Sequence, residues 1–290
     1  MANSNGWGDG AANNAIGWGQ GANNNIGWGK SHATSWAGAT DIVGLTTDAD
    51  AQAFITAAAI TDPTQQTAID TLVKGMKADG TWTKMKAIYP FVGGTATTHK
   101  WNLKDPRDLD AAFRLVFNGG WTHSSNGATP NGTNGYADTK LAPNVMAQNS
   151  ISISSYIRTT LTASQIYMGS SGGGVLTYLY NADYQALNSI DNLTVSTIAG
   201  QNGLISISRI ASNQYKLLKN GIVLNTISSV SLTPNSNALY IAARNNGGAI
   251  SQYGNNQTAF AHIADGLTDT ESANLYTRVQ AFQTSLSRQV

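Results

Sequence analysis

The chain has 290 residues, a formal net charge of +1 and only 11% charged residues, well below the usual quarter of a globular protein. It shows no basic patch or acidic tail, so nucleic acid and anionic membranes are poor partners. No apolar run approaches the length of a membrane-spanning helix. Cysteine is absent, which excludes disulfides, thiolate metal sites and cysteine nucleophiles.

The first 36 residues repeat a Trp-Gly unit that is unsuited to an enzyme core. Glycines flank the tryptophans and favour an extended or looping backbone over a helix. Regularly spaced aromatic side chains are suitable anchors for pockets on another surface. We expect this segment, residues 1–43, to be extended and to dock on other chains. The expected anchors are Trp7, Ile16, Trp18, Ile26, Trp28 and Trp36. The alternative is a flexible Gly/Asn tail that packs on its own domain.

Residues 44–85 predict a small helical hairpin that acts as a spacer. The stretch from Asp48 to Ile60 carries Phe54, Ile55, Ala58 and Ala59 for one face. The second helix begins at Asp62-Pro63, a good N-cap followed by proline at the first helical position, and Gly80 closes it.

Residues 86–290 predict an antiparallel β-sandwich. Short stretches with strand character are separated by Gly, Asn and Ser turns, and Asn220-Gly221 is a hairpin turn. Thr268 and Glu271 form a capping box that starts a C-terminal helix. The strand candidates are 112–117, 150–157, 165–168, 175–180, 204–210, 215–219, 222–227 and 239–243. The expected fold is therefore mainly β, with an extended segment, a helical hairpin, a sandwich and a closing helix.

Several segments resemble virion proteins of crAss-like and related tailed phages. The resemblance is carried by the Ile-Gly-Trp-Gly repeats, by residues 82–94, 99–110 and 122–139, and by the closing 266–276 segment. It implies a concanavalin A-like, laminin-G-like jelly roll in a head fibre, tail fibre or decoration protein. It also implies other virion proteins as partners. A virion protein assembles in the host cytoplasm without a signal peptide, and the residues after Met1 show no basic segment followed by an apolar run. We expect a homotrimer, since fibres gain avidity from several weak sites.

The carboxylates argue against hydrolysis. Glycosidases need two carboxylates across the scissile bond, but the chain has a single glutamate, Glu271, which the capping box explains. Asp105, Asp108 and Asp110 form an acidic cluster among basic residues, which favours an ion-pair loop over a catalytic site. We expect no enzymatic activity. A polysaccharide depolymerase remains an alternative, as does a secreted or cell-surface lectin.

No cofactor is expected. The four histidines are scattered without the spacing of a zinc site. Asp138, Asp183 and Asp191 could contribute to a structural calcium site, although no ligand spacing supports one.

Host-surface glycan is the remaining candidate ligand, because exposed aromatic rings stack on sugars and amide side chains read hydroxyl groups. The favoured residues are Trp101, Trp121, Tyr136, Tyr253 and Asn255, with Tyr178, Tyr180, Asn245, Asn246 and Asn256 as further candidates. The alternative is that most of these aromatics fill the core.

Overall fold

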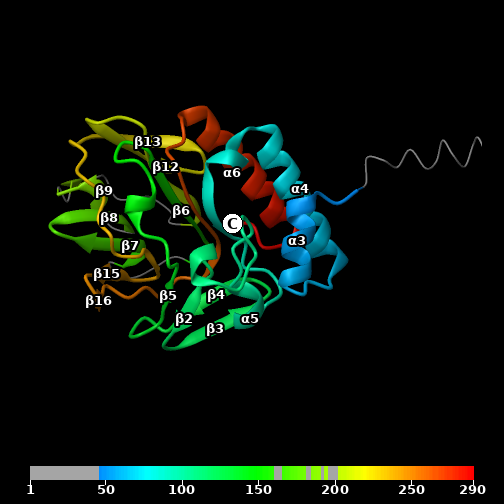
Figure 1. The fold of residues 1–290 in the computed structure, drawn as a ribbon. Coiled ribbons are helices and arrows are strands. Elements are labelled where there is room, and N and C mark those ends of the chain that lie inside the picture. Colours follow the sequence, from blue (N-terminus) through cyan, green and yellow to red (C-terminus); the bar gives the residue numbers. More distant parts are fainter. Residues whose placement is uncertain (1–45, 160–164, 181–183, 191–192, 195–201) are drawn as a thin grey trace, which may run out of the picture. The chain divides into compact units, whose positions relative to one another are not determined.

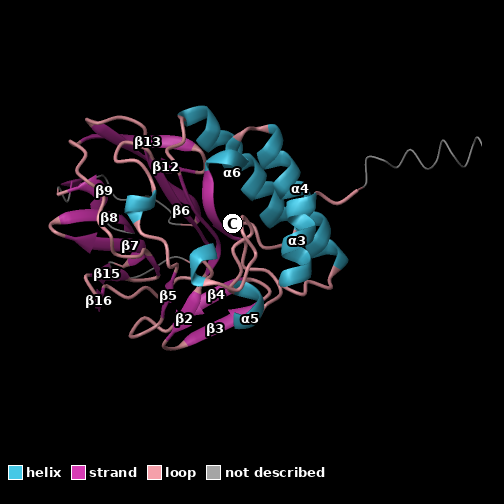
Figure 2. Cartoon of the chain, in the orientation of Figure 1, coloured by secondary structure: helices cyan, strands magenta, loops and turns pink. Residues whose placement is uncertain are grey.

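The computed structural model describes residues 46–159, 165–180, 184–190, 193–194 and 202–290. The Trp-Gly segment, Asp183 and Asp191, for which the sequence makes predictions, lie outside these residues. The residues from Asp48 to Val290 form one compact unit. Figures 1 and 2 show its two kinds of element: strands fill one side, and the longer helices gather on the other.

The strands form two sheets that pack face to face, so the expected sandwich is confirmed. Neighbouring strands are antiparallel, except that β15 runs parallel to β7. The first sheet has the order β13 (Ile222–Ser228), β12 (Gln214–Lys219), β11 (Gly203–Arg209), β6 (Ile151–Ile157), β17 (Thr258–Ala264), β4 (Gly127–Pro130) and β3 (Trp121–Ser124), with β1 (Met85–Tyr89) also paired to β17. The second sheet has the order β10 (Leu193–Thr194), β9 (Tyr184–Ser189), β8 (Val175–Tyr180), β7 (Ile166–Gly172), β14 (Tyr240–Ile241), β5 (Tyr136–Asp138) and β2 (Val116–Asn118), with β15 (Arg244–Asn246) beside β7 and β16 (Ala249–Ser251) beside β15.

The main core lies between the sheets. Alternation along each strand sends one set of side chains inward, so Ile153, Ile207 and Ile263 of the first sheet share a core with Ala137 and Ile241 of the second. The hairpin between β12 and β13 turns at Asn220-Gly221, as expected. Both residues have positive φ, 50° and 75°, as a two-residue turn of this type requires.

The helices cover the outer face of the first sheet. Helix α4 (Pro63–Ala78) begins where the sequence predicts, because the Asp62 carboxylate accepts from the backbone N–H of Thr64 at 2.7 Å. Gly80 follows in the left-handed conformation. Helix α6 (Asp269–Ser285) packs beside α4 and is capped by Thr268. The remaining helical segments are α3 (Ala49–Ala57), α5 (Ala96–His99), η3 (Thr81–Lys84), η4 (Asp110–Ala112) and η5 (Pro143–Val145).

The helical hairpin is not a separate spacer, which corrects the expected division at residue 86. Phe54 and Leu72 of the helices share a buried cluster with Tyr156 and Phe260 of the first sheet and with Phe282 of α6. The apolar face that a hairpin would need to bury elsewhere is therefore buried on its own sandwich. Ala59, expected on that face, is exposed with φ at 52°.

Two predicted strands are shorter than expected. In the stretch 112–117, Phe113 adopts φ of 59°, so the strand β2 starts only at Val116. In the stretch 239–243, Ala242 adopts φ of 66° and ends β14 after Ile241. A left-handed residue breaks the ladder in each case.

Candidate functional site

The outer face of the second sheet carries the candidate site. Ala137 and Ile241 point into the core, so their strand neighbours Tyr136, Asp138 and Tyr240 point to the opposite face. Tyr240 is also the direct partner of Asp138 in the β5–β14 ladder. The long helices pack on the other sheet, so they leave this face uncovered.

Tyrosine rings meet on this face. The rings of Tyr136 and Tyr240 stack with centroids 4.7 Å apart and planes 25° apart. Burial raises the pKa of Tyr240 to about 12, with further contributions from Asp138 and Tyr136. Burial, then Asp138 and Tyr253, raise the pKa of Tyr136. The phenols of Tyr136 and Tyr240 therefore remain protonated donors at neutral pH. We call Tyr136, Tyr240 and Tyr253 the tyrosine face.

An asparagine-rich loop borders the tyrosine face. Asn131 accepts three backbone N–H bonds, from Thr133, Asn134 and Gly135, at 3.0–3.1 Å. This loop lies against Asn255: a Cβ added to Gly132 would lie 3.1 Å from the Cβ of Asn255. The Asn255 side chain is exposed, so it presents amide donors and acceptors beside the loop.

The structure brings Trp121, Tyr136, Tyr253 and Asn255 into one region. Trp121 contacts the backbone beside the site. Its Nε1 donates to the carbonyls of Asn118 and Tyr136 at 3.0 and 3.3 Å, and its ring packs against the main core. Its indole N–H is therefore already used by the protein itself.

The other aromatic candidates lie elsewhere or are buried. Trp101 packs against the helix-side cluster, and the Lys100 Nζ lies 4.8 Å from its ring centroid. Tyr178 and Tyr180 are on the outer face of the second sheet but are only 4% and 7% exposed. Of the further asparagines, Asn245 and Asn256 are buried and Asn246 is exposed. Tyr240, which sequence reasoning did not select, is the residue that completes the stack.

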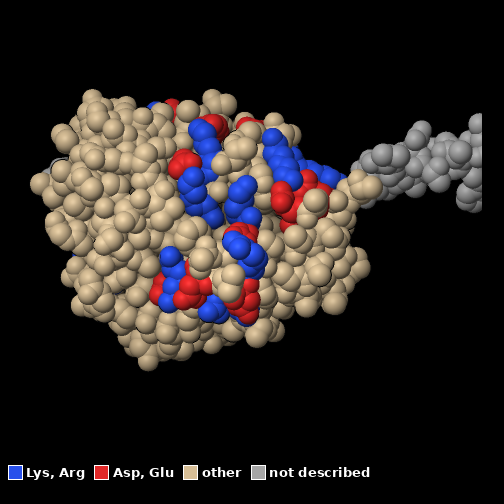
Figure 3. All heavy atoms as spheres, in the orientation of Figure 1, with Lys and Arg blue, Asp and Glu red and all other residues tan. Residues whose placement is uncertain are grey.

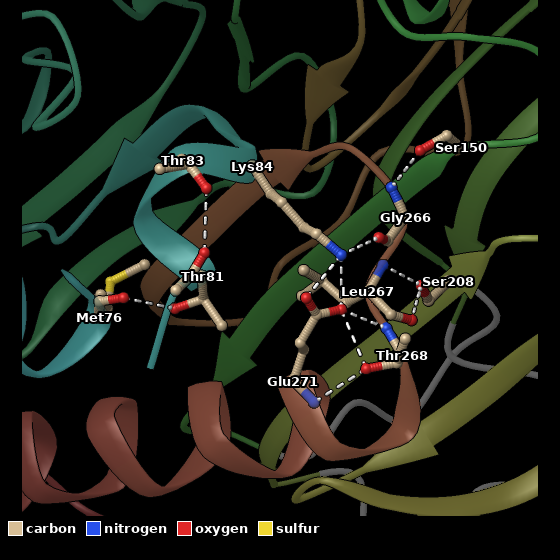
Figure 4. A network of polar contacts seen from close by, with 11 residues as sticks. Met76, Thr81, Thr83, Lys84, Ser150, Ser208, Gly266, Leu267, Thr268 and Glu271 are labelled. Carbon is tan, nitrogen blue, oxygen red and sulfur yellow. Dashed lines mark hydrogen bonds and ion pairs between the residues drawn. The ribbon is translucent and has the colours of Figure 1, made fainter. Parts of the chain in front are cut away.

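Glu271 has a structural role at the start of α6. Its carboxylate closes the capping box by accepting from the Thr268 backbone N–H at 2.8 Å, and it pairs with Lys84 at 2.6 Å (Figure 4). The Lys84 hydrogen bond and the Thr268 N–H outweigh burial, so the pKa of Glu271 is lowered. Lys84 thereby ties the end of η3 to the start of α6.

The acidic cluster is an ion-pair loop. Arg107 pairs with Asp105 at 2.5 Å, Lys100 with Asp108 at 2.5 Å and Arg114 with Asp110 at 3.0 Å. The hydrogen bond from Arg107 lowers the pKa of Asp105, and the one from Lys100 lowers the pKa of Asp108. Asp105 and Asp108 are thereby held ionised, which suits neither a general acid nor a raised-pKa base.

No group of three potential metal ligands occurs among the described residues. Asp138, expected as a possible calcium ligand, instead lies 3.0 Å from Lys140 Nζ and accepts from its own loop at Lys140 N. In the same described ranges, no helix is both long and apolar enough to cross a bilayer.

Two histidines that are distant in the sequence meet in the structure. The Nδ1 atoms of His99 and His123 are 2.9 Å apart, next to Phe91 and Phe117. Burial, then His123 and Arg288, lower the pKa of His99 to about 3. Burial also lowers the pKa of His123, so both rings are neutral at neutral pH, and one Nδ1 donates to the other. It is a packing contact with a hydrogen bond, and no sequence pattern predicts that these two histidines meet.

A groove of about 430 Å³ lies between α4 and α6, away from the tyrosine face. Its walls include Thr67, Thr71, Leu72 and Phe282, and its one charged group, Arg278, is held by Asp79 at 2.7 Å. The groove lacks the convergent polar groups of a ligand site. We therefore assign the candidate site to the tyrosine face, which has both stacked rings and amide groups.

No family model matches the chain, and no curated protein matches it. Among solved structures, domain 4 of an extracellular GH43 arabinanase from Geobacillus stearothermophilus, in complex with arabinotriose, is similar over 66% of this chain and 98% of that one. The TM-score is 0.44 and the identity 14%. The binding domain of botulinum neurotoxin serotype D gives a TM-score of 0.42 at 9% identity, over 68% of this chain and 52% of that one. Trypanosoma rangeli sialidase gives a TM-score of 0.43 at 10% identity, over 73% of this chain and 39% of that one. At these values the architecture rests on the chain's own strand pairing.

Proposed function

We propose that the sandwich is a non-catalytic glycan-binding module and that the tyrosine face holds the sugar. The observation that carries this proposal is the stack of Tyr136 on Tyr240, with Tyr253 nearby, on a sheet face that the long helices leave uncovered. Flat aromatic surfaces take the apolar faces of sugar rings, and protonated phenols and the Asn255 amide supply hydrogen bonds to hydroxyl groups.

The surface charge fits this assignment. Figure 3 shows the Lys, Arg, Asp and Glu side chains in a band that runs from the helices down to the region of β5, whereas the surface over β8 and β9 is uncharged in that view. The charges on β5 beside Tyr136 are paired, because Asp138 lies 3.0 Å from Lys140 Nζ. Binding would then depend on stacking and hydrogen bonds more than on long-range attraction, so we expect weak, millimolar-class affinity for a single site.

The test is affinity electrophoresis in native gels that contain arabinan, xylan, β-glucan or a uronate polysaccharide. Retardation of the wild-type chain should be lost in Tyr136→Ala and Tyr240→Ala. Tyr276→Ala removes the same side chain from α6, on the other sheet's side, and should be retarded like the wild type. A chain that no polysaccharide retards would refute the proposal.

We further propose that residues 1–43 attach this module to a phage particle as a fibre, spike or decoration protein, displayed as a homotrimer. The repeated Trp-Gly units at Trp7, Trp18 and Trp28 support attachment, because spaced aromatic anchors suit pockets on a partner. Several weak sites on one particle would bind a host surface by avidity. A secreted lectin would share the sandwich but would not need these anchors.

Removal of residues 1–43 should abolish incorporation into particles and leave affinity electrophoresis unchanged. Native mass spectrometry should give trimers of the full chain. Truncated protein that still enters particles, or a chain that is monomeric both free and released from the particle, would contradict attachment or trimerisation respectively.

A further inference from the structure

Arg244, on the same outer sheet face, forms no ion pair with the residues that the structure describes. Its backbone pairs with Gly169 of β7, as does that of Tyr240. Gly169 also pairs with the outward-facing Tyr178. Directly paired residues point to one face of a sheet, so the Arg244 side chain lies on the face that carries Tyr240.

Two polar atoms beside each other there lack partners. The Nε of Arg244 and the Oγ of Ser251 are both buried, and neither has a hydrogen bond. These two residues are direct neighbours across the β15–β16 ladder. Buried polar groups in native proteins are nearly always satisfied, and leaving them unsatisfied is costly. Two such atoms on paired positions therefore indicate a group that is supplied from outside the chain.

The local charge favours an anion. Within the described ranges no carboxylate pairs with Arg244, and Asp138 on the same sheet face is paired with Lys140 at 3.0 Å. Arg244 as a whole is only partly buried although its Nε is shielded from water, so the residue lies at the edge of the solvent. A guanidinium fork with an adjacent hydroxyl matches the two oxygens of a carboxylate.

We propose that Arg244 and Ser251 bind the carboxylate of an acidic sugar whose ring lies on the tyrosine face. The inference rests on the proposed glycan-binding function and narrows its ligand to uronic-acid-type or other carboxylated glycans. The tyrosine face supplies stacking for any sugar, and Arg244 selects the charged one.

The experiment compares polygalacturonate, alginate and hyaluronan with their carboxyl-reduced forms, in which each carboxylate has become a neutral hydroxymethyl group. Affinity electrophoresis of the full chain should show binding to at least one acidic form about tenfold tighter than to its reduced form, as one charged hydrogen bond provides. Arg244→Gln should remove that preference, and Ser251→Ala should weaken it. Lys74→Gln makes the same charge change on α4 and should retain it. Thermal unfolding of each variant checks that the fold is intact.

Four results overturn the inference. If acidic and carboxyl-reduced forms retard the chain equally, the carboxylate site is refuted and the glycan-binding proposal stands. The same holds if Arg244→Gln and Ser251→Ala both keep the preference for the acidic form. Retardation by arabinan, xylan or β-glucan alone also refutes the carboxylate site and leaves the glycan-binding proposal standing. Retardation by no polysaccharide removes both proposals.

Discussion

The outer faces of the two sheets are used in different ways. On the first sheet, Tyr156 and Phe260 are fully buried beneath α4 and α6. On the second sheet, Tyr136 and Tyr240 stack on a face without such a helical layer. Both faces carry aromatic side chains, so residue type alone does not separate core from site. What separates them is how far each ring is buried: Tyr178 and Tyr180 of the second sheet are buried as well, whereas Tyr136 and Tyr240 are only partly buried.

The polar groups differ in the same way. On the helix-covered face, His262 lies between Ser152 and Ser154, with its ring nitrogens 3.3 and 2.5 Å from their hydroxyls. On the outer face of the second sheet, Arg244 Nε and Ser251 Oγ have no hydrogen-bond partner in the part of the chain that the structure describes. A satisfied network stabilises one conformation, whereas unsatisfied groups are available to a ligand.

The largest effect should come from the helix-covered face. Phe260→Ala removes a fully buried ring between β17 and the helices, and we expect the free energy of unfolding to fall by about 3–5 kcal/mol. Urea unfolding measures this. Ile222→Ala, at a position that is 68% exposed, is the control and should change little. A loss below about 1 kcal/mol for Phe260→Ala would mean that packing between the helices and this face contributes little to stability.

Acid should also act on the helix-covered face. Burial lowers the pKa of His262 to about 3, from 6.5 in the unfolded chain. The unfolded state binds the proton more tightly, so the stabilisation is complete above pH 6.5 and is lost as the pH falls toward 3. The loss reaches ~1.4 kcal/mol per pH unit for each such histidine. His99, whose pKa is also lowered to about 3, adds a second acid-sensitive contribution to stability.

The measurement is urea unfolding at pH 7, 5.5 and 4.5, with His262→Gln as the comparison. Glutamine cannot take up the proton, so the variant should lose less stability than the wild type between pH 7 and 4.5, even if it is less stable at pH 7. Carboxylates titrate equally in both proteins and cancel in the difference. Parallel pH curves for the two proteins would show that burial of His262 does not govern acid stability.

The uncovered face should respond in binding more than in stability. Tyr240→Ala removes one ring of the stack, which contributes about 0.5–1.5 kcal/mol to stability beyond its area. We expect glycan retardation to be lost and unfolding to change far less than in Phe260→Ala. Tyr240→Phe keeps the ring and loses the hydroxyl, so it separates stacking from hydrogen bonding. If Tyr240→Ala destabilises the chain as much as Phe260→Ala, the tyrosine face is part of the core and the comparison fails.

The predictable parts of this fold are those with local signals. The caps at Asp62 and Thr268 and the Asn220-Gly221 turn each act within a few residues, and all three are confirmed. Strand β17 was missed because it is buried on both faces and has His262 at its centre, so it shows no alternation. In contrast, β6 and β11 carry the Ile-Ser alternation that marks a strand even though they are buried too.

The candidate site was only partly predictable for the same reason. Tyr136 and Asn255 were selected as aromatic and amide residues near turns, and they do lie near one another. Tyr240 and Arg244 were not selected, because their role depends on pairing with Gly169 of a strand far away in the chain. Trp101 had the right residue type, but it packs on the helix side. Residue type gives candidates, and sheet register decides which of them meet.

The smallest effects should come from the polar contacts at the start of α6, which join the helix layer to the sandwich. Thr268→Ala removes the N-cap hydroxyl that accepts from Glu271 N at 3.2 Å, and we expect a loss of about 1 kcal/mol in unfolding free energy. Glu271→Gln should cost less, because glutamine also closes a capping box. It gives up the Lys84 ion pair, a contact that lies partly exposed to water and is worth less than about 1 kcal/mol. Both variants should bind glycan as the wild type does, since α6 lies on the covered face. Chemical unfolding and affinity electrophoresis of the same preparations test this together: a binding defect in Glu271→Gln with normal stability would give this carboxylate a role in the ligand site and would end the division between the two faces.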